Sequence, residues 1–225
     1  MKHIDKLLKK NQKFAADTLI TLPVAKDHGY YAGILYCYLQ DKQSEQASYV
    51  GNYNMRNGIR WIPKLTNSEI LADLPVFPDI GTLNDAIRTL RKEGLILTET
   101  TGAFLEQGHA TGRKRDIATW WHVSREYVAK NNVPSDYFDK SKRQVVSALE
   151  AVAFGISVAL ILGHWRARDV VEQDATGVYK RLSAVELEKV LPMDERTVRR
   201  NLKYLVNRQI LFVHRDKPKL YRLKQ

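Results

Sequence analysis

The chain has 225 residues, of which 44% are hydrophobic and 27% are charged. This length and composition are typical of a globular protein with one large domain or two small ones, and they exclude a disordered tail, a collagen-like repeat and a small disulfide scaffold. Lys and Arg total 36 against 25 Asp and Glu, a formal net charge of +11. Such an excess favours a polyanionic partner, either nucleic acid or an anionic membrane surface.

The positive charge is concentrated near the C-terminus. Residues 177–225 carry 13 basic and 5 acidic side chains, a net charge of +8, whereas residues 116–176 carry 7 and 8. This distribution indicates a basic C-terminal module rather than a uniformly basic protein.

Cysteine usage and the first residues bear on the compartment. Cys37 is the single cysteine, so no intramolecular disulfide and no cysteine-based zinc site can form. Residues 1–14 lack the apolar core of a signal peptide. We therefore expect a cytoplasmic protein, without a metal or a cofactor.

The N-terminal half is predicted to form one module, residues 27–123, after a basic segment of residues 1–26. The module is predicted to contain a helix, a pair of helices joined by a turn, and a long hairpin, at about Asp27–Asp41, Glu69–Pro75, 82–93 and Leu95–Val123. In the last helix Leu83, Ile87 and Leu90 are spaced to line one face, which is typical of an amphipathic helix.

A linker of residues 124–142 is predicted before an apolar segment, Val145–Trp165, whose one charged residue is Glu150. The segment is long enough to span a bilayer, but a charge within a span is costly. A helix buried on all sides in a core or a dimer interface also lacks a polar face. We therefore expect a long buried helix at about Arg143–Arg168 and no membrane insertion.

The C-terminal module, residues 143–225, repeats the pattern of the first. Residues 69–75 align with 186–192, and residues 82–97 align with 197–212. Val198, Leu202 and Leu205 therefore occupy the positions of the first copy's apolar face. The second hairpin is predicted to run from Ile210 to Leu223 through a basic turn, Arg215–Lys219.

Capping signals mark the helix ends in both copies. Thr66 with Glu69, and Ser183 with Glu186, fit the capping box at a helix start. Gly94 is a natural C-terminal cap of the first long helix. Its counterpart Gln209 is a poorer cap, so the pattern defines the second boundary less well.

Each copy thus reads helix, helix, tight turn, helix, strand, loop, strand. The run from Thr82 to Leu97 and its repeat resemble the recognition helix and first wing strand of the winged helix-turn-helix family. The first copy, with GILYCYLQDK upstream and RTLRKEGLI after the helix pair, resembles modules of phage and plasmid replication-initiation or regulatory proteins. The resemblance covers roughly 27–123 and 143–223, although the first hairpin is longer than a compact wing.

This resemblance implies a mainly α fold with small β-hairpins, in the α+β class, in which two winged helix-turn-helix modules are joined by the long apolar helix. It also implies binding of double-stranded DNA. With the apolar face inward, the second long helix turns basic and amide side chains outward, and Arg and Asn are the residues that read guanine and adenine in the major groove. The expected DNA-binding residues of this module are Arg196, Arg199, Arg200, Lys203, Asn207, Arg215, Lys217 and Lys219.

The first module is the poorer DNA-binding candidate, because Asp85 lies among its outward cations. Its competing role is dimerisation. A flexible basic run at the hairpin tip is of the kind that reaches into a minor groove or contacts the backbone. The expected DNA-binding residues here are Asn84, Arg88, Arg91, Lys92, Arg113, Lys114 and Arg115.

Catalytic patterns are absent from the sequence. The six His residues include no His-x-His pair and no HExxH, and no GxxxxGK[ST] occurs. We expect a non-catalytic, sequence-specific DNA-binding protein that initiates replication, or regulates transcription, of a phage-type or plasmid-type mobile element. The alternative is a protein-interaction scaffold or dimerisation module of a replication or segregation complex. Expected partners are DNA, a second copy of the chain, and replication or transcription machinery.

Overall fold

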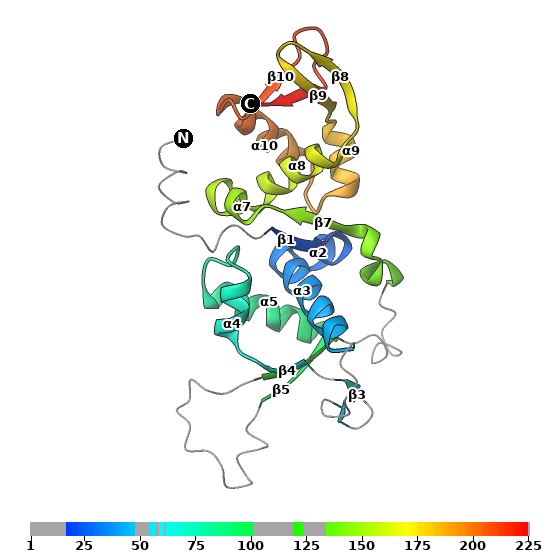
Figure 1. Cartoon of the computed structure of the whole chain (residues 1–225), viewed down its shortest axis with the longest axis vertical. Coiled ribbons are helices and arrows are strands. Elements are labelled where there is room, and N and C mark those ends of the chain that lie inside the picture. Colours follow the sequence, from blue (N-terminus) through cyan, green and yellow to red (C-terminus); the bar gives the residue numbers. More distant parts are fainter. Residues whose placement is uncertain are drawn as a thin grey trace. The chain divides into compact units, whose positions relative to one another are not determined.

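The computed structural model describes residues 17–47, 55–56, 59–60, 62–100, 119–123 and 134–224. The fold is mixed α+β, with helices and small antiparallel sheets (Figure 1). The chain divides into an N-terminal unit, Leu19–Arg143, and a C-terminal unit, Gln144–Gln225 with Met1–Thr18. The second predicted module thus begins within one residue of the division. The described part of the predicted linker, residues 134–142, belongs to the N-terminal unit, and residues 124–133 lie outside the described residues.

In the N-terminal unit, two consecutive helices precede a helix pair and a three-stranded sheet. The elements are β1 (Thr18–Thr21), α2 (Leu22–His28), α3 (Tyr30–Ala47), β2 (Met55–Arg56), β3 (Ile59–Arg60), β4 (Ile62–Leu65), α4 (Asn67–Asp73), α5 (Ile80–Lys92), β5 (Ile96–Thr100) and β6 (Thr119–Val123). β6 lies between β4 and β5. Trp121 on β6 is buried, and its indole Nε1 donates a hydrogen bond to the Leu65 carbonyl at 2.9 Å.

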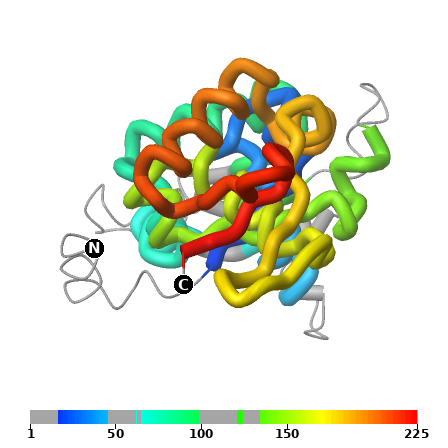
Figure 2. Tube along the Cα trace, turned by 90° about the horizontal axis from the view of Figure 1, so that it is seen from above, coloured from blue at the N-terminus to red at the C-terminus, as the bar shows by residue number. Residues whose placement is uncertain are grey.

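The C-terminal unit has a similar order of elements, with two described strands directly before its helix pair where the N-terminal unit has three. They are β7 (Arg143–Val146), α7 (Ala148–Phe154), α8 (Ile156–Ala167), β8 (Val170–Asp174), β9 (Gly177–Arg181), α9 (Ala184–Val190), α10 (Glu195–Asn207), β10 (Leu211–Val213) and β11 (Leu220–Leu223). The antiparallel sheet has the order β10-β11-β9-β8. The chain leaves α10 and returns through β10 and β11, the red end of the tube in Figure 2.

The prediction of one long helix at Arg143–Arg168 is wrong. A strand and two helices occupy the segment, and the break between the helices is at Gly155, whose φ of +91° lies in the left-handed region that favours glycine. Gly29, with φ +95°, separates α2 from α3 in the same way. Each of these glycines donates its N–H to a carbonyl four residues earlier at 2.9 Å, which closes the last turn of the preceding helix.

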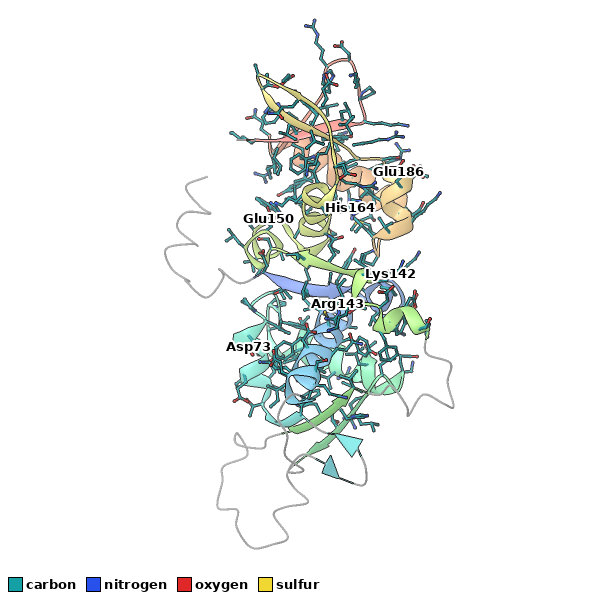
Figure 3. All side chains as sticks on the ribbon, turned by 45° about the vertical axis from the view of Figure 1, so that its right-hand side comes forward. Asp73, Lys142, Arg143, Glu150, His164 and Glu186 are labelled. Carbon is teal, nitrogen blue, oxygen red and sulfur yellow. The ribbon has the colours of Figure 1, made fainter. Side chains whose placement is uncertain are left out.

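The single charge of the apolar segment is paired. Glu150 on α7, labelled in Figure 3, accepts a hydrogen bond at 2.9 Å from Nη1 of Arg166 on α8, and this pairing offsets the cost of its partial burial. Within the described residues no helix is both long enough and apolar enough to cross a membrane.

Two N-terminal boundaries also differ from prediction. The predicted basic segment, residues 1–26, includes β1 and the start of α2; residues 1–16 lie outside the described residues. The predicted linker contains two short 3₁₀ helices, Ser135–Phe138 and Lys140–Lys142. Tyr137 anchors the first of them, because it is buried and its hydroxyl donates a hydrogen bond to Asp27 at 2.5 Å.

The predicted capping boxes have different outcomes. Thr66 and Glu69 form both hydrogen bonds of the box, so this prediction is confirmed. Ser183 makes no side-chain capping bond. Its partner Glu186, labelled in Figure 3, instead forms ion pairs with Arg181 and Arg168, at 3.5 and 3.8 Å.

The ends of α5 and α10 match closely despite their different residues. Gly94 and Gln209 both adopt the left-handed conformation, with φ of +69° and +55°. The amide after each, on Leu95 and Ile210, donates to the carbonyl five residues earlier at 2.9 Å. This pairing is the Schellman type of helix end. Gln209 is therefore a true counterpart of Gly94, held in a conformation that is costly for a residue with a Cβ.

Because a left-handed residue other than glycine costs about 1–2 kcal/mol, we expect Gln209→Gly to stabilise the C-terminal unit. Part of that gain is offset by the greater chain entropy of glycine when unfolded, which leaves a net gain of about 0.5–1 kcal/mol. Urea unfolding followed by circular dichroism measures the change. Gly94→Ala is the matched control and is expected to destabilise by a similar amount. A lowered urea midpoint for Gln209→Gly would contradict this account of the helix end.

The single thiol lies in the core. The side chain of Cys37 on α3 has no exposed surface, and burial raises its pKa to about 11. Because only the thiolate is an effective nucleophile, Cys37 is chemically inert at neutral pH.

Candidate nucleic-acid interface

Helix α10 presents a basic face on one side and a buried face on the other. At its start the Asp194 carboxylate accepts a hydrogen bond from the Thr197 amide at 2.6 Å, and this bond holds the pKa of Asp194 below its usual value. Val198, Leu202 and Leu205 are buried, as predicted. The opposite side chains are exposed, also as predicted: Arg196, Arg199, Arg200, Lys203 and Asn207.

Four of these side chains form a continuous stripe. Arg196, Arg200, Lys203 and Asn207 follow one another at spacings of four, three and four residues, so they lie along one line of the helix surface. Among the described residues none of the three cations of the stripe forms an ion pair. The stripe therefore presents three exposed cations next to one amide, with the Asp194 carboxylate nearby at the start of the helix.

Arg199 lies beside the stripe and is paired. Its Nε donates to Oε1 of Glu195, one helical turn earlier, at 2.7 Å, and its Nη2 contacts the same oxygen. Arg199 thus contributes less net charge to the surface than Arg196 or Arg200.

A groove of about 420 Å³ lies next to Arg199, between α10, the first residues of α9 and the hairpin of β10 and β11. Three cations line it, Arg199, Lys203 and Lys219. The remaining lining is largely apolar and includes Val185, Leu202, Val206, Pro218 and Tyr221. The groove accordingly has the size of a small ligand site, with positive charge contributed by two different elements.

The turn of this hairpin, residues His214–Lys219, carries the other predicted cations. Arg215, Lys217 and Lys219 are exposed. Backbone hydrogen bonds of 2.9 Å, from His214 to Leu220 and from Leu220 to Lys217, hold the turn. Lys217 is paired within the protein, because its Nζ donates to Oε2 of Glu172 on β8 at 2.5 Å.

The predicted residues of α5 are exposed but carry less available charge. Asn84 accepts a hydrogen bond from Asn67 at 3.1 Å, and Arg88 pairs with Asp85 at 3.0 Å. Arg91 and Lys92 are also exposed, at the end of the helix. The repeat places Gly81 and Asp85 at the positions of Arg196 and Arg200, so α5 lacks the two arginines at the start of the basic stripe.

Three predicted residues of the first hairpin, Arg113, Lys114 and Arg115, lie outside the described residues. In the part of the chain that is described, no group of three or more His, Cys, Asp or Glu side chains is placed to hold a metal ion. Comparison with protein family models, curated proteins and solved structures finds no match for this chain.

Sequence reasoning missed Glu172, the partner of Lys217. The two residues are far apart in the sequence, and only the pairing of β8 with β9 and of β9 with β11 brings them together. The prediction of the helix pair and hairpin did not include these additional strands. Two short runs that contain strand-favouring residues, Val170-Val171 and Val178-Tyr179, lie on either side of a loop with Gly177, and this was a usable hairpin signal.

Proposed function

We propose that this chain binds double-stranded DNA without catalysis, and that each unit is a winged helix-turn-helix module. The observation that carries the proposal is the basic stripe of α10, whose arginines are exposed and unpaired among the described residues. The strand order shared by the two units supports the module assignment, since β5-β6-β4 corresponds to β10-β11-β9.

In this proposal α10 enters the major groove and the hairpin contacts the DNA backbone. Arg196 and Arg200 have the fork of donors that pairs with guanine, and Asn207 has the amide that pairs with adenine. Lys203 and Lys219, which line the groove between α10 and the hairpin, contact phosphates. In this arrangement the arginines recognise bases, and the lysines position the protein on the duplex through phosphate contacts.

The biological role proposed is initiation of replication, or regulation of transcription, for a phage-type or plasmid-type element in the cytoplasm. It rests on the resemblance of the repeated motif to such proteins. Two linked DNA-binding modules also raise each other's effective concentration on neighbouring sites, so two weak interactions together bind tightly.

One observation favours a second role for the N-terminal unit. Ile80 at the start of α5 is 53% exposed and follows the capping residue Asp79, and the Asp85–Arg88 pair cancels two charges further along the helix. An exposed apolar side chain next to the Asp79 carboxylate suits a protein contact better than a polyanion. In this alternative the unit is a dimerisation or scaffold module. Sedimentation of the DNA-free protein at micromolar concentration tests it, and Ile80→Asp is expected to shift a dimer to monomer.

Electrophoretic mobility shift tests DNA binding itself. The full chain is titrated against a pool of fragments from its source genome and against random duplex of equal length. A sequence-specific binder selects a subset of fragments and retains them in excess random duplex. A scaffold protein binds both pools weakly and equally, and that result would overturn the proposal.

Phosphate binding leaves a distinct signature in salt dependence. Because each neutralised phosphate releases counterions, the slope of log affinity against log salt falls in magnitude by about 0.9 for each phosphate that the protein no longer neutralises. We expect Lys219→Ala to reduce the slope by about this amount for target and random duplex alike. Lys189→Ala on α9 is the charge-matched control. An unchanged slope for Lys219→Ala would exclude this residue from the interface.

A further inference from the structure

Glu172 brings together a small cluster beside the C-terminal hairpin. Its Oε2 accepts from Lys217 Nζ at 2.5 Å, and its Oε1 lies 3.5 Å from Nε2 of His214. Glu172 comes from β8, whereas both partners come from the residues that join β10 to β11. A single carboxylate therefore tethers the basic hairpin turn to the far edge strand of the sheet.

The contacts of His214 determine which of its ring nitrogens faces Glu172. The Asp216 amide donates to Nδ1 of His214 at 3.1 Å, so Nδ1 is an acceptor and the ring proton lies on Nε2, the nitrogen nearest Glu172. The ring also packs edge-on against Tyr179, with centroids 4.9 Å apart. His214 is nearly buried while Lys217 is 57% exposed. The carboxylate thus has one partner held in the protein and one in solvent.

The pair cancels one of the three cations of the turn. Lys217 is the hydrogen-bond donor that holds the pKa of Glu172 below its usual value, so the carboxylate is ionised at neutral pH. Arg215 and Lys219 in the same turn have no ion-pair partner among the described residues. A phosphate that approaches Lys217 must displace a carboxylate that is already in place.

We propose that Glu172 is an intramolecular competitor of DNA phosphate for Lys217, and that it limits the sequence-independent affinity of the hairpin. This inference rests on the proposed DNA-binding function. An exposed ion pair contributes little to folding, so removal of the carboxylate changes DNA binding more than stability. Glu172 acts as a positioning residue, through Lys217 rather than by touching DNA.

The test is a double-mutant cycle on random duplex DNA, with NaCl varied from low to physiological concentration. Glu172→Gln releases Lys217 for one more phosphate. We expect random-duplex affinity to rise about threefold to tenfold at low salt, and the slope of log affinity against log salt to steepen by about 0.9. In a Lys217→Ala background the same Glu172→Gln change should alter neither quantity.

Asp216→Asn is the matched control, since it removes one carboxylate charge beside the same hairpin turn, and Asp216 forms no ion pair with Lys217 among the described residues. The inference is overturned if Asp216→Asn gives an equal gain, or if the gain from Glu172→Gln persists in the Lys217→Ala background, because general charge then explains it. An unchanged slope for Glu172→Gln with normal DNA binding by the parent also overturns it, and the proposed function then stands. If neither the parent chain nor the Glu172→Gln variant binds duplex at low salt, the proposed DNA-binding function is wrong, and so is this inference.

Discussion

Val158→Asp is expected to unfold the C-terminal unit. Val158 is 4% exposed on α8, in a helix whose Ala159, Leu160, Ile161 and Leu162 are fully buried. An unpaired carboxylate at this position loses its hydration and also removes apolar packing, a combination that costs more than about 4 kcal/mol. Domains of this size have only about 5–15 kcal/mol of stability in total. Urea unfolding followed by circular dichroism measures the effect, and we expect the helical signal to be lost already at low urea.

Val152→Asp is the matched control for this substitution. Val152 lies on α7 and is 44% exposed. The same change of residue there leaves the carboxylate in water, so we expect a change of less than about 0.5 kcal/mol. Ala153, its neighbour, is half-buried and is a weaker test than Val158. Equal urea midpoints for the two valine variants would mean that α8 is not packed as the structure has it.

Arg196→Ala and Arg200→Ala are each expected to weaken specific DNA binding by about 1–3 kcal/mol, as removal of a bidentate base contact does. Random-duplex affinity should fall much less, so the ratio of specific to random affinity drops. Competition mobility shift with a selected fragment and random duplex measures this ratio. Because Arg199 is already hydrogen-bonded to Glu195, Arg199→Ala should weaken specific DNA binding less than Arg196→Ala or Arg200→Ala does.

An arginine of the other long helix, α5, supplies a control for those variants. The control variant is Arg88→Ala. Arg88 lies on α5 at the position that corresponds to Lys203, and it is already paired with Asp85. We expect Arg88→Ala to leave the specificity ratio unchanged. If the Arg196→Ala/Arg200→Ala double variant binds a selected fragment as tightly as the parent, α10 does not read bases.

The sequence predicted the helix pairs and the hairpin strands that follow them, because these elements depend on short-range signals. Apolar residues spaced three and four apart define the buried faces of α5 and α10. The capping residues Asp79 and Asp194 directly precede the two helices, and Gly94 and Gln209 lie two residues after their ends. The exposed face of α10 follows directly from its buried face. The exposure of its five candidate residues was therefore predictable, although their partners were not.

The missed features depend on residues distant in sequence or on single backbone conformations. Strands β4 and β9 precede their helix pairs and join sheets formed mainly by later residues. The helix break at Gly155 has a counterpart at Gly29 in the sequence, because Ser147 and Thr21 lie eight residues before these two glycines. Apolar composition outweighed that glycine in the prediction of one long helix. Glu172 could not be placed without the sheet.

The buried thiol makes the chain well suited to spectroscopic labelling. Because Cys37 is the only cysteine, is shielded from solvent and ionises only at high pH, a maleimide dye will react with an introduced surface cysteine and leave the native one untouched. Cysteines introduced in turn at Asn84 and Asn207 would report separately on α5 and α10. Fluorescence changes on addition of duplex would then show which helix DNA reaches, without any prior replacement in the core.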